Sequence, residues 1–122
     1  MANLVITVGH NAGSYYPLGN RTLTVGRDPA RDIQLVDERA GRKHFQIRKD
    51  GDDYAVIDLR SKNGLYVNGL KVGEATLTDG DEIQAGDTVL TFWLHDTPDR
   101  TNALNRYKKA THEMRDDKTI VD

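Results

Sequence analysis

The stretch LYVNGLKV, residues 65–72, sets the pattern for most of the chain. Apolar residues occupy alternate positions on both sides of Asn68-Gly69. Asn-Gly between two such runs is the strongest short sequence signal for a β-hairpin. We therefore predict two short strands joined by a tight turn at residues 68–69.

The same combination of short strands and turn residues extends in both directions from this hairpin. The segments that read as strands are LVITV (4–8), RTLTVG (21–26), HFQIRK (44–49), YAVIDL (54–59) and EIQAGDTVLTFWL (82–94). The turn signal DGDD at 50–53 makes a second hairpin, and Ala85-Gly86-Asp87 divides the last segment into a strand pair. Short strands at close spacing with turns between them indicate an antiparallel sandwich or barrel.

The composition limits the function classes. The 122 residues suit one domain plus an extension, and 37% hydrophobic residues can fill a modest core. A net charge of -2 gives no support for nucleic-acid or anionic-membrane binding, and the absence of cysteine excludes disulfides and thiolate metal sites. The start MANLVITVGHN is too quickly polar for a secretory signal, and no apolar run approaches a membrane span. We expect a cytoplasmic protein.

Three stretches carry chemistry that a scaffold does not need. They are VGRDPARD (25–32), ERAGRKH (38–44) and DLRSKNGLYVNG (58–69). Each combines a glycine with basic or amide side chains in an expected loop between strands. Loops at one end of a sandwich can converge on a common ligand.

In this order the three stretches resemble the forkhead-associated (FHA) domain, a module that binds phosphothreonine peptides. The resemblance covers about residues 4–94. It rests on Gly26-Arg27, Arg42-Lys43-His44, Ser61-Lys62-Asn63-Gly64 and Val67-Asn68-Gly69. It implies an FHA domain over residues 1–95 with an eleven-stranded antiparallel β-sandwich. The peptide-binding loops would lie at one end and both termini at the other.

The resemblance also assigns roles to single residues. Arg27 and Arg42 would contact the phosphate. Its nearly two negative charges favour hydrogen bonds from cationic donors such as arginine. Asn63 would hold the peptide backbone, and Arg39 would favour an aspartate three residues after the phosphothreonine. The implied phosphothreonine and peptide site is Arg27, Arg39, Gly41, Arg42, Ser61, Lys62 and Asn63. The implied loop-structural residues are Gly26, His44, Gly64, Asn68 and Gly69. Of these, His44 would brace the loops by hydrogen bonds, while Asn68-Gly69 also fits hairpin geometry alone.

Two positions depart from the family pattern. Gly41 stands where the family has a serine that donates to the phosphate, and Lys62 stands where threonine is frequent. One interpretation is that the site has exchanged hydroxyl donors for cations and still binds phosphate. The other is a degenerate FHA domain that acts as a phosphate-independent interaction or assembly module. Gly41 could also serve only to allow a positive φ.

Residues 96–122 form a C-terminal tail in this interpretation. Thr97-Pro98-Asp99 resembles a helix start, and a thin apolar stripe predicts a helix over 98–115, followed by a mobile end at 116–122. Within that end, Thr119 has Asp122 three residues after it. Thr119 is therefore a candidate phosphosite, and the tail a candidate ligand for the chain's own loops, in cis or in trans.

No residue constellation supports an enzyme. The carboxylates form no recognisable acid–base pair, and His10, His95 and His112 show no metal-ligand spacing. We expect no cofactor and no metal. The sequence favours a non-enzymatic adaptor in Ser/Thr kinase signalling whose partners are phosphothreonine-containing proteins or peptides.

Overall fold

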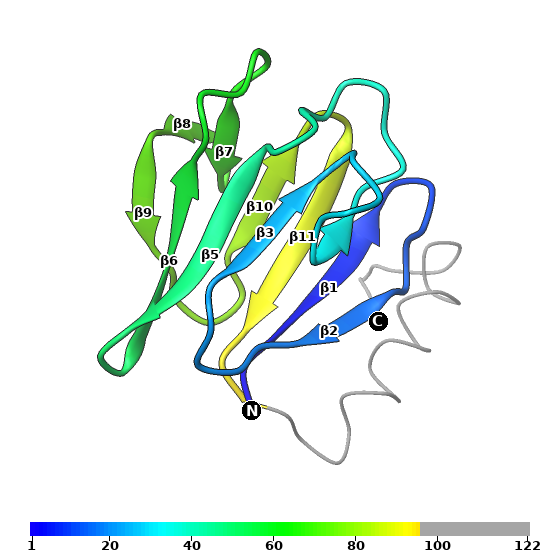
Figure 1. Cartoon of the computed structure of the whole chain (residues 1–122). Coiled ribbons are helices and arrows are strands. Elements are labelled where there is room, and N and C mark those ends of the chain that lie inside the picture. Colours follow the sequence, from blue (N-terminus) through cyan, green and yellow to red (C-terminus); the bar gives the residue numbers. More distant parts are fainter. Residues whose placement is uncertain (96–122) are drawn as a thin grey trace, which may run out of the picture.

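A computed structural model describes residues 1–95, which form eleven strands in two sheets packed face to face (Figure 1). The six-stranded sheet has the order β2 (Tyr15–Pro17), β1 (Asn3–Val8), β11 (Thr88–Trp93), β10 (Glu82–Ala85), β7 (Leu65–Val67), β8 (Leu70–Val72). The five-stranded sheet has the order β4 (Ile33–Gln34), β3 (Leu23–Gly26), β5 (Phe45–Asp50), β6 (Asp53–Asp58), β9 (Glu74–Thr76). The predicted eleven-stranded β-sandwich is confirmed.

The three hairpins predicted from turn residues are present. They are β5–β6, β7–β8 and β10–β11, all antiparallel. Asn68 and Gly69 both have positive φ, 51° and 85°, which is the geometry a two-residue hairpin turn requires.

One strand pair is parallel, which the expectation of an antiparallel sandwich did not include. β3 and β4 run side by side with Val25 opposite Ile33. The connection first turns at Asp28, whose side-chain oxygen accepts from the backbone N–H of Ala30. It then returns alongside β3, where Asp32 accepts from the backbone N–H of Thr24. The chain therefore enters β4 in the same direction as β3.

The core lies between the sheets and follows from the alternation of apolar residues. Phe45 on β5 and Phe92 on β11 are fully buried. Tyr54 on β6 packs against Phe92, with ring centroids 5.6 Å apart, and so joins the two sheets. Trp93, the next residue along β11, is only half-buried. Phe92 and Trp93 thus face opposite sides of the strand, as their adjacent positions predicted.

The loops with the basic and amide residues share one end of the sandwich. β3 ends, β5 begins, β6 ends and β10 turns into β11 at this end, the upper end in Figure 1, which we call the loop end. The chain starts at the opposite end, where Asn3 pairs with Trp93 at the close of β11. In residues 1–95 no helix is long and apolar enough to cross a membrane. The predicted helix at 98–115 and mobile end at 116–122 lie outside the described residues.

Candidate functional site at the loop end

Gly26 lets the segment 39–42 lie directly on the end of β3. A Cβ atom at Gly26 would overlap the carbonyl oxygen of Arg42 and come within 2.9 Å of that of Gly41. Two hydrogen bonds fix the approach: the N–H of Arg27 donates to the carbonyl of Gly41 at 2.8 Å, and that of His44 to the carbonyl of Val25 at 2.8 Å. The glycine is therefore required for close packing of backbone on backbone, and not for an unusual φ.

His44 joins two of the loops from inside the molecule. Its side chain is fully buried. Nδ1 accepts from the backbone N–H of Gly41 at 2.9 Å, so the proton of the neutral ring is on Nε2, which lies 2.8 Å from the carbonyl oxygen of Gly64 and donates to it. Both ring nitrogens are thereby satisfied, and each holds a glycine from a different loop.

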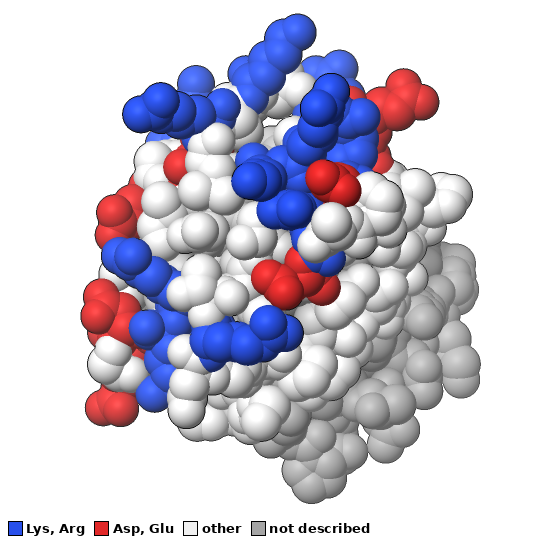
Figure 2. Space-filling model, viewed as in Figure 1, with Lys and Arg blue, Asp and Glu red and all other residues white. Residues whose placement is uncertain are grey.

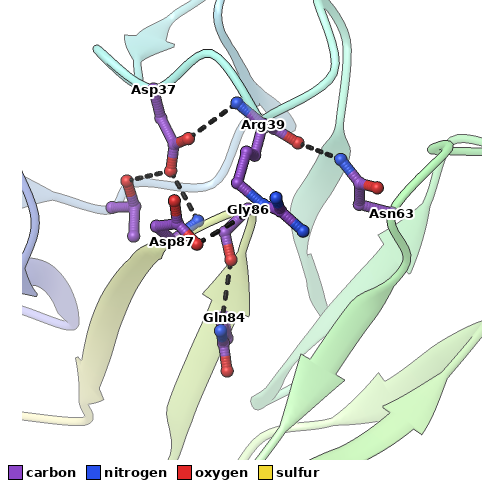
Figure 3. Close-up of polar contacts among 7 residues, drawn as sticks. Asp37, Arg39, Asn63, Gln84, Gly86 and Asp87 are labelled. Atoms are coloured by element: carbon purple, nitrogen blue, oxygen red, sulfur yellow. Dashed lines mark hydrogen bonds and ion pairs between the residues drawn. The ribbon is translucent and has the colours of Figure 1, made fainter.

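Asn63 and Asp37 hold Arg39 from its two backbone sides (Figure 3). The side-chain amide of Asn63 donates to the carbonyl oxygen of Arg39 at 2.7 Å. The carboxylate of Asp37 accepts from the backbone N–H of Arg39 at 2.8 Å. The backbone of Arg39 is therefore fixed, while its side chain remains 65% exposed.

Asp37 also ties this loop to the turn between β10 and β11. Its Oδ2 accepts from the backbone N–H of Asp87 and from the hydroxyl of Thr88, both at 2.7 Å. Burial raises the pKa of Asp37, but the hydrogen bonds from Thr88, Arg39 and Asp87 outweigh it and lower the pKa below its ordinary value of 3.8. Gly86 completes the contact, because a Cβ there would lie 2.8 Å from the backbone nitrogen of Ala40.

The loop end carries five cations that have no ion-pair partner in the described part of the chain. Within residues 1–95, no carboxylate lies within ion-pair distance of these side chains, which are Arg27, Arg42, Lys43, Arg60 and Lys62. All five residues are exposed. Figure 2 shows Lys and Arg gathered over this end of the molecule. Arg27 is the most constrained of them, because its Nε donates to the carbonyl of Ala40 at 3.1 Å.

The structure separates the predicted site residues into two groups. Hydrogen bonds bring together the segments that hold Gly26, Arg27, Arg39, Gly41, Arg42, His44, Asn63 and Gly64, with Ser61 and Lys62 on the same loop as Asn63. Asn68 and Gly69 lie elsewhere, at the far end of β7. There the side chain of Asn68 donates to Asp81 at 2.9 Å and accepts from the N–H of Glu82. Asn68 thus does more than shape a hairpin, because it ties the β7–β8 turn to β10.

At two positions of the site, Ser61 and Gly41, the structure differs from the expected role. The hydroxyl of Ser61 donates to Asp58 at 2.6 Å, so Ser61 supports its own loop rather than presenting a free donor. Gly41 does not have a positive φ, and a Cβ there would meet nothing closer than 3.6 Å. The idea that Gly41 serves to relieve backbone strain is therefore wrong, and a serine would fit.

Sequence reasoning missed Asp37, Gly86 and Asp87 as parts of this site. Gly86 and Asp87 carried a turn signal, and nothing local indicated that they meet a loop about fifty positions earlier. Arg60, with φ at 59°, was likewise not singled out. Among residues 1–95 no group of three or more His, Asp or Glu side chains could hold a metal ion.

Comparisons with known proteins agree with this geometry. The FHA domain family model matches residues 23–86, which is more than half of the chain. The oxoglutarate dehydrogenase inhibitor of Corynebacterium jeikeium is 44% identical over 91 residues, covering 75% of this chain and 63% of that protein. The glycogen accumulation regulator GarA of Mycolicibacterium smegmatis is 43% identical over 91 residues, covering 75% of this chain and 58% of that protein.

A solved structure from a study of phosphothreonine-dependent FHA domain interactions has a TM-score of 0.72 and 31% identity, covering 79% of this chain and 98% of that one. This chain spans less than two thirds of the length of the two curated relatives. The match to the family model nevertheless includes the segments 26–27, 39–44 and 61–64 of the loop end. The chain belongs to the FHA domain family.

Proposed function

We propose that this chain is a non-enzymatic adaptor that binds phosphothreonine peptides at the loop end, in Ser/Thr kinase signalling in the cytoplasm. One observation carries the proposal: Arg27, Arg42 and Lys62 are exposed and have no carboxylate partner in the described chain, on loops that are hydrogen-bonded to one another. A phosphate dianion supplies the missing negative charge and accepts several hydrogen bonds at once.

The arrangement suits a ligand that is recognised rather than transformed. Within residues 1–95, the site presents exposed cations and the Asn63 amide, and the hydroxyl of its one serine, Ser61, is taken up by Asp58 in the same loop. The segments 39–42 and 61–64 are held by buried and backbone hydrogen bonds, so binding costs little loop ordering. The names of the relatives, an inhibitor and a regulator, are in keeping with a protein that acts through contacts with other proteins.

The absence of a hydroxyl at Gly41 favours a second candidate function, a phosphate-independent interaction module. A hydrogen bond to a charged group contributes about 1.5–3 kcal/mol, so its loss could remove much of the phosphate affinity. Lys62 offsets that loss by charge alone, with stronger screening by salt. The two functions therefore differ in one measurable property, the dependence of binding on the phosphate.

The test is a calorimetric titration of the full chain, made in a host without a Ser/Thr kinase. The probes are the peptide DDKTIVD with and without a phosphate on its threonine, followed by a library of other phosphothreonine peptides. We expect phosphorylated peptides to bind and unphosphorylated ones not to. Arg27→Ala should weaken binding about tenfold to a hundredfold, since a charge-assisted hydrogen bond is lost.

Lys49→Ala is the control for charge. Lys49 is exposed and lies near the β5–β6 turn, away from the loop end. Among residues 1–95 its side chain bonds only to the carbonyl of Gly51. It should leave affinity nearly unchanged. Equal binding of phosphorylated and unphosphorylated peptides would contradict the proposal and support the phosphate-independent module.

We further propose that the chain's own tail is one such ligand, through Thr119 with Asp122 facing Arg39. About 25 residues separate β11 from Thr119, and as random coil a chain of that length would span roughly 28 Å. The sandwich is about 20 Å long along a six-residue strand, so the tail can reach the loop end. Tethering would raise the effective concentration of a weak ligand to the millimolar range.

Phosphorylation at Thr119 tests this part separately. A chain phosphorylated there should bind an added phosphothreonine peptide at least tenfold more weakly if the tail docks in cis. Docking in trans should instead give a concentration-dependent rise in mass by light scattering. Unchanged affinity and an unchanged mass would refute the tail as a ligand and leave the loop-end site unaffected.

A further inference from the structure

Arg39 already has a carboxylate beside it. Its Nε lies 3.5 Å from Oδ1 of Asp87, and the two side chains are 65% and 74% exposed. The pair is an ion pair without a short hydrogen bond, and such exposed pairs contribute little to stability. It is therefore easily exchanged for another partner.

The proximity of the two side chains is built into the fold. Asp37 accepts from the backbone N–H of Arg39 through Oδ1 and from that of Asp87 through Oδ2. One carboxylate thus fixes both backbones relative to each other, although the two residues lie on different loops (Figure 3). The packing of Gly86 against Ala40 holds the same two segments in contact.

The charge of Asp87 changes how strongly Arg39 attracts an acidic ligand. The guanidinium of Arg39 donates no hydrogen bond within residues 1–95, so its N–H groups remain open to an acidic ligand. A ligand carboxylate that reaches them would enter the field of Asp87 as well. The attraction to Arg39 is then reduced by repulsion between two carboxylates that share one cation.

We infer that Asp87 is a specificity-determining residue that weakens the preference of Arg39 for an acidic side chain in the bound peptide. The inference rests on the proposed function, because it concerns peptides bound at the loop end. Asp87 acts as an internal competitor: peptides with a neutral residue facing Arg39 bind with the Arg39–Asp87 pair intact, and acidic peptides must disturb it. The chain thus accepts a broader range of phosphothreonine sequences than Arg39 alone would allow.

The experiment compares two amidated peptides on the full chain, DDKpTIVD and DDKpTIVN, where pT is phosphothreonine. The quantity measured is the dissociation constant of DDKpTIVN divided by that of DDKpTIVD. A larger ratio means a stronger preference for the acidic peptide. Asp87→Asn keeps the backbone N–H that binds Asp37 and removes only the charge. We expect this variant to raise the preference for the acidic peptide about twofold to fivefold, the range typical of an exposed ion pair.

Glu38→Gln is the matched control. Glu38 is exposed, lies next to Arg39 in sequence and has no ion pair in the described chain. Removing its charge should strengthen the binding of both anionic peptides by the same factor and leave the ratio unchanged. In an Arg39→Gln background, Asp87→Asn should raise the ratio less than in the wild-type background, because only direct repulsion from Asp87 remains to be removed.

The outcomes are distinct. An unchanged or reduced ratio in Asp87→Asn would overturn the inference, and a reduced ratio would show that Asp87 orients Arg39 for acidic ligands. Failure of both phosphopeptides and the wider phosphothreonine library to bind the wild-type chain would instead refute the proposed function. A ratio that rises equally in Glu38→Gln would assign the effect to the general field of the loop end.

Discussion

Removing the side chain of His44 should both destabilise the protein and release the loop end. The ring is fully buried and satisfies the N–H of Gly41 and the carbonyl of Gly64. In His44→Ala the buried carbonyl of Gly64 and the partly buried N–H of Gly41 lose their partners, at about 1–3 kcal/mol each, and the missing ring leaves a cavity. The free energy of unfolding should therefore fall by about 2–6 kcal/mol, a large part of the 5–15 kcal/mol typical of a domain.

Two readouts separate the expected effects. Urea unfolding gives the loss of stability, and for a domain of this size the melting temperature should fall by about 10 °C or more. Hydrogen exchange at Gly41 reports the loop itself, since its N–H has no other acceptor in the described chain. That amide should exchange much faster in a variant that remains folded.

His10→Ala is the control, because His10 is exposed and makes no hydrogen bond or ion pair within residues 1–95. It should change the free energy of unfolding by less than about 0.5 kcal/mol. If His44→Ala lowers the free energy of unfolding no more than His10→Ala does, the two hydrogen bonds of the His44 ring do not hold the loops. If stability falls but the exchange of Gly41 does not change, His44 supports the core and not the site.

Three further predictions follow from the same contacts. Gly26→Ala should lower the free energy of unfolding by about 1–3 kcal/mol in urea, whereas Gly73→Ala, with open space around it, should not. Gly41→Ser should strengthen phosphothreonine-peptide binding about tenfold by calorimetry, because the hydroxyl fits there and can donate to the phosphate. The lowered pKa of Asp37 stabilises the fold fully above pH 3.8; comparison with Asp37→Asn across a pH series should show this advantage shrinking as the pH falls further.

Local signals in the sequence were enough to predict eight of the eleven strands and the three hairpins, but not the short strands β2, β4 and β9. Asn68-Gly69 predicted a turn because both residues tolerate positive φ, and both have it. The parallel pairing of β3 with β4 could not be predicted, because it depends on the path of the connecting loop. Hydrogen bonds from backbone N–H groups to the side chains of Asp28 and Asp32 fix that path. The alternation of apolar and polar residues along the strands carries no information about the path of that loop.

The site shows the same division between local and long-range contacts. Arg27, Arg42 and Asn63 were identified because the order of the motifs resembles a family. The contact between Asp37 and Asp87 joins positions fifty residues apart, and no local sequence pattern around either residue predicts it. The sequence also does not reveal the local surroundings of Ser61 and Gly41. Only the structure shows that the hydroxyl of Ser61 is bonded to Asp58 and that a hydroxyl-bearing side chain would fit at Gly41.

Chemical-shift mapping on the full chain shows whether phosphothreonine peptides bind at the loop end. A phosphothreonine peptide and its unphosphorylated form are each titrated into the labelled protein, and the amide shifts of residues 1–95 are compared. We expect only the phosphorylated peptide to shift amide signals, with the largest shifts on residues 26–27, 39–43 and 61–64. Equal shifts with both peptides, or shifts centred away from those three segments, would contradict this expectation.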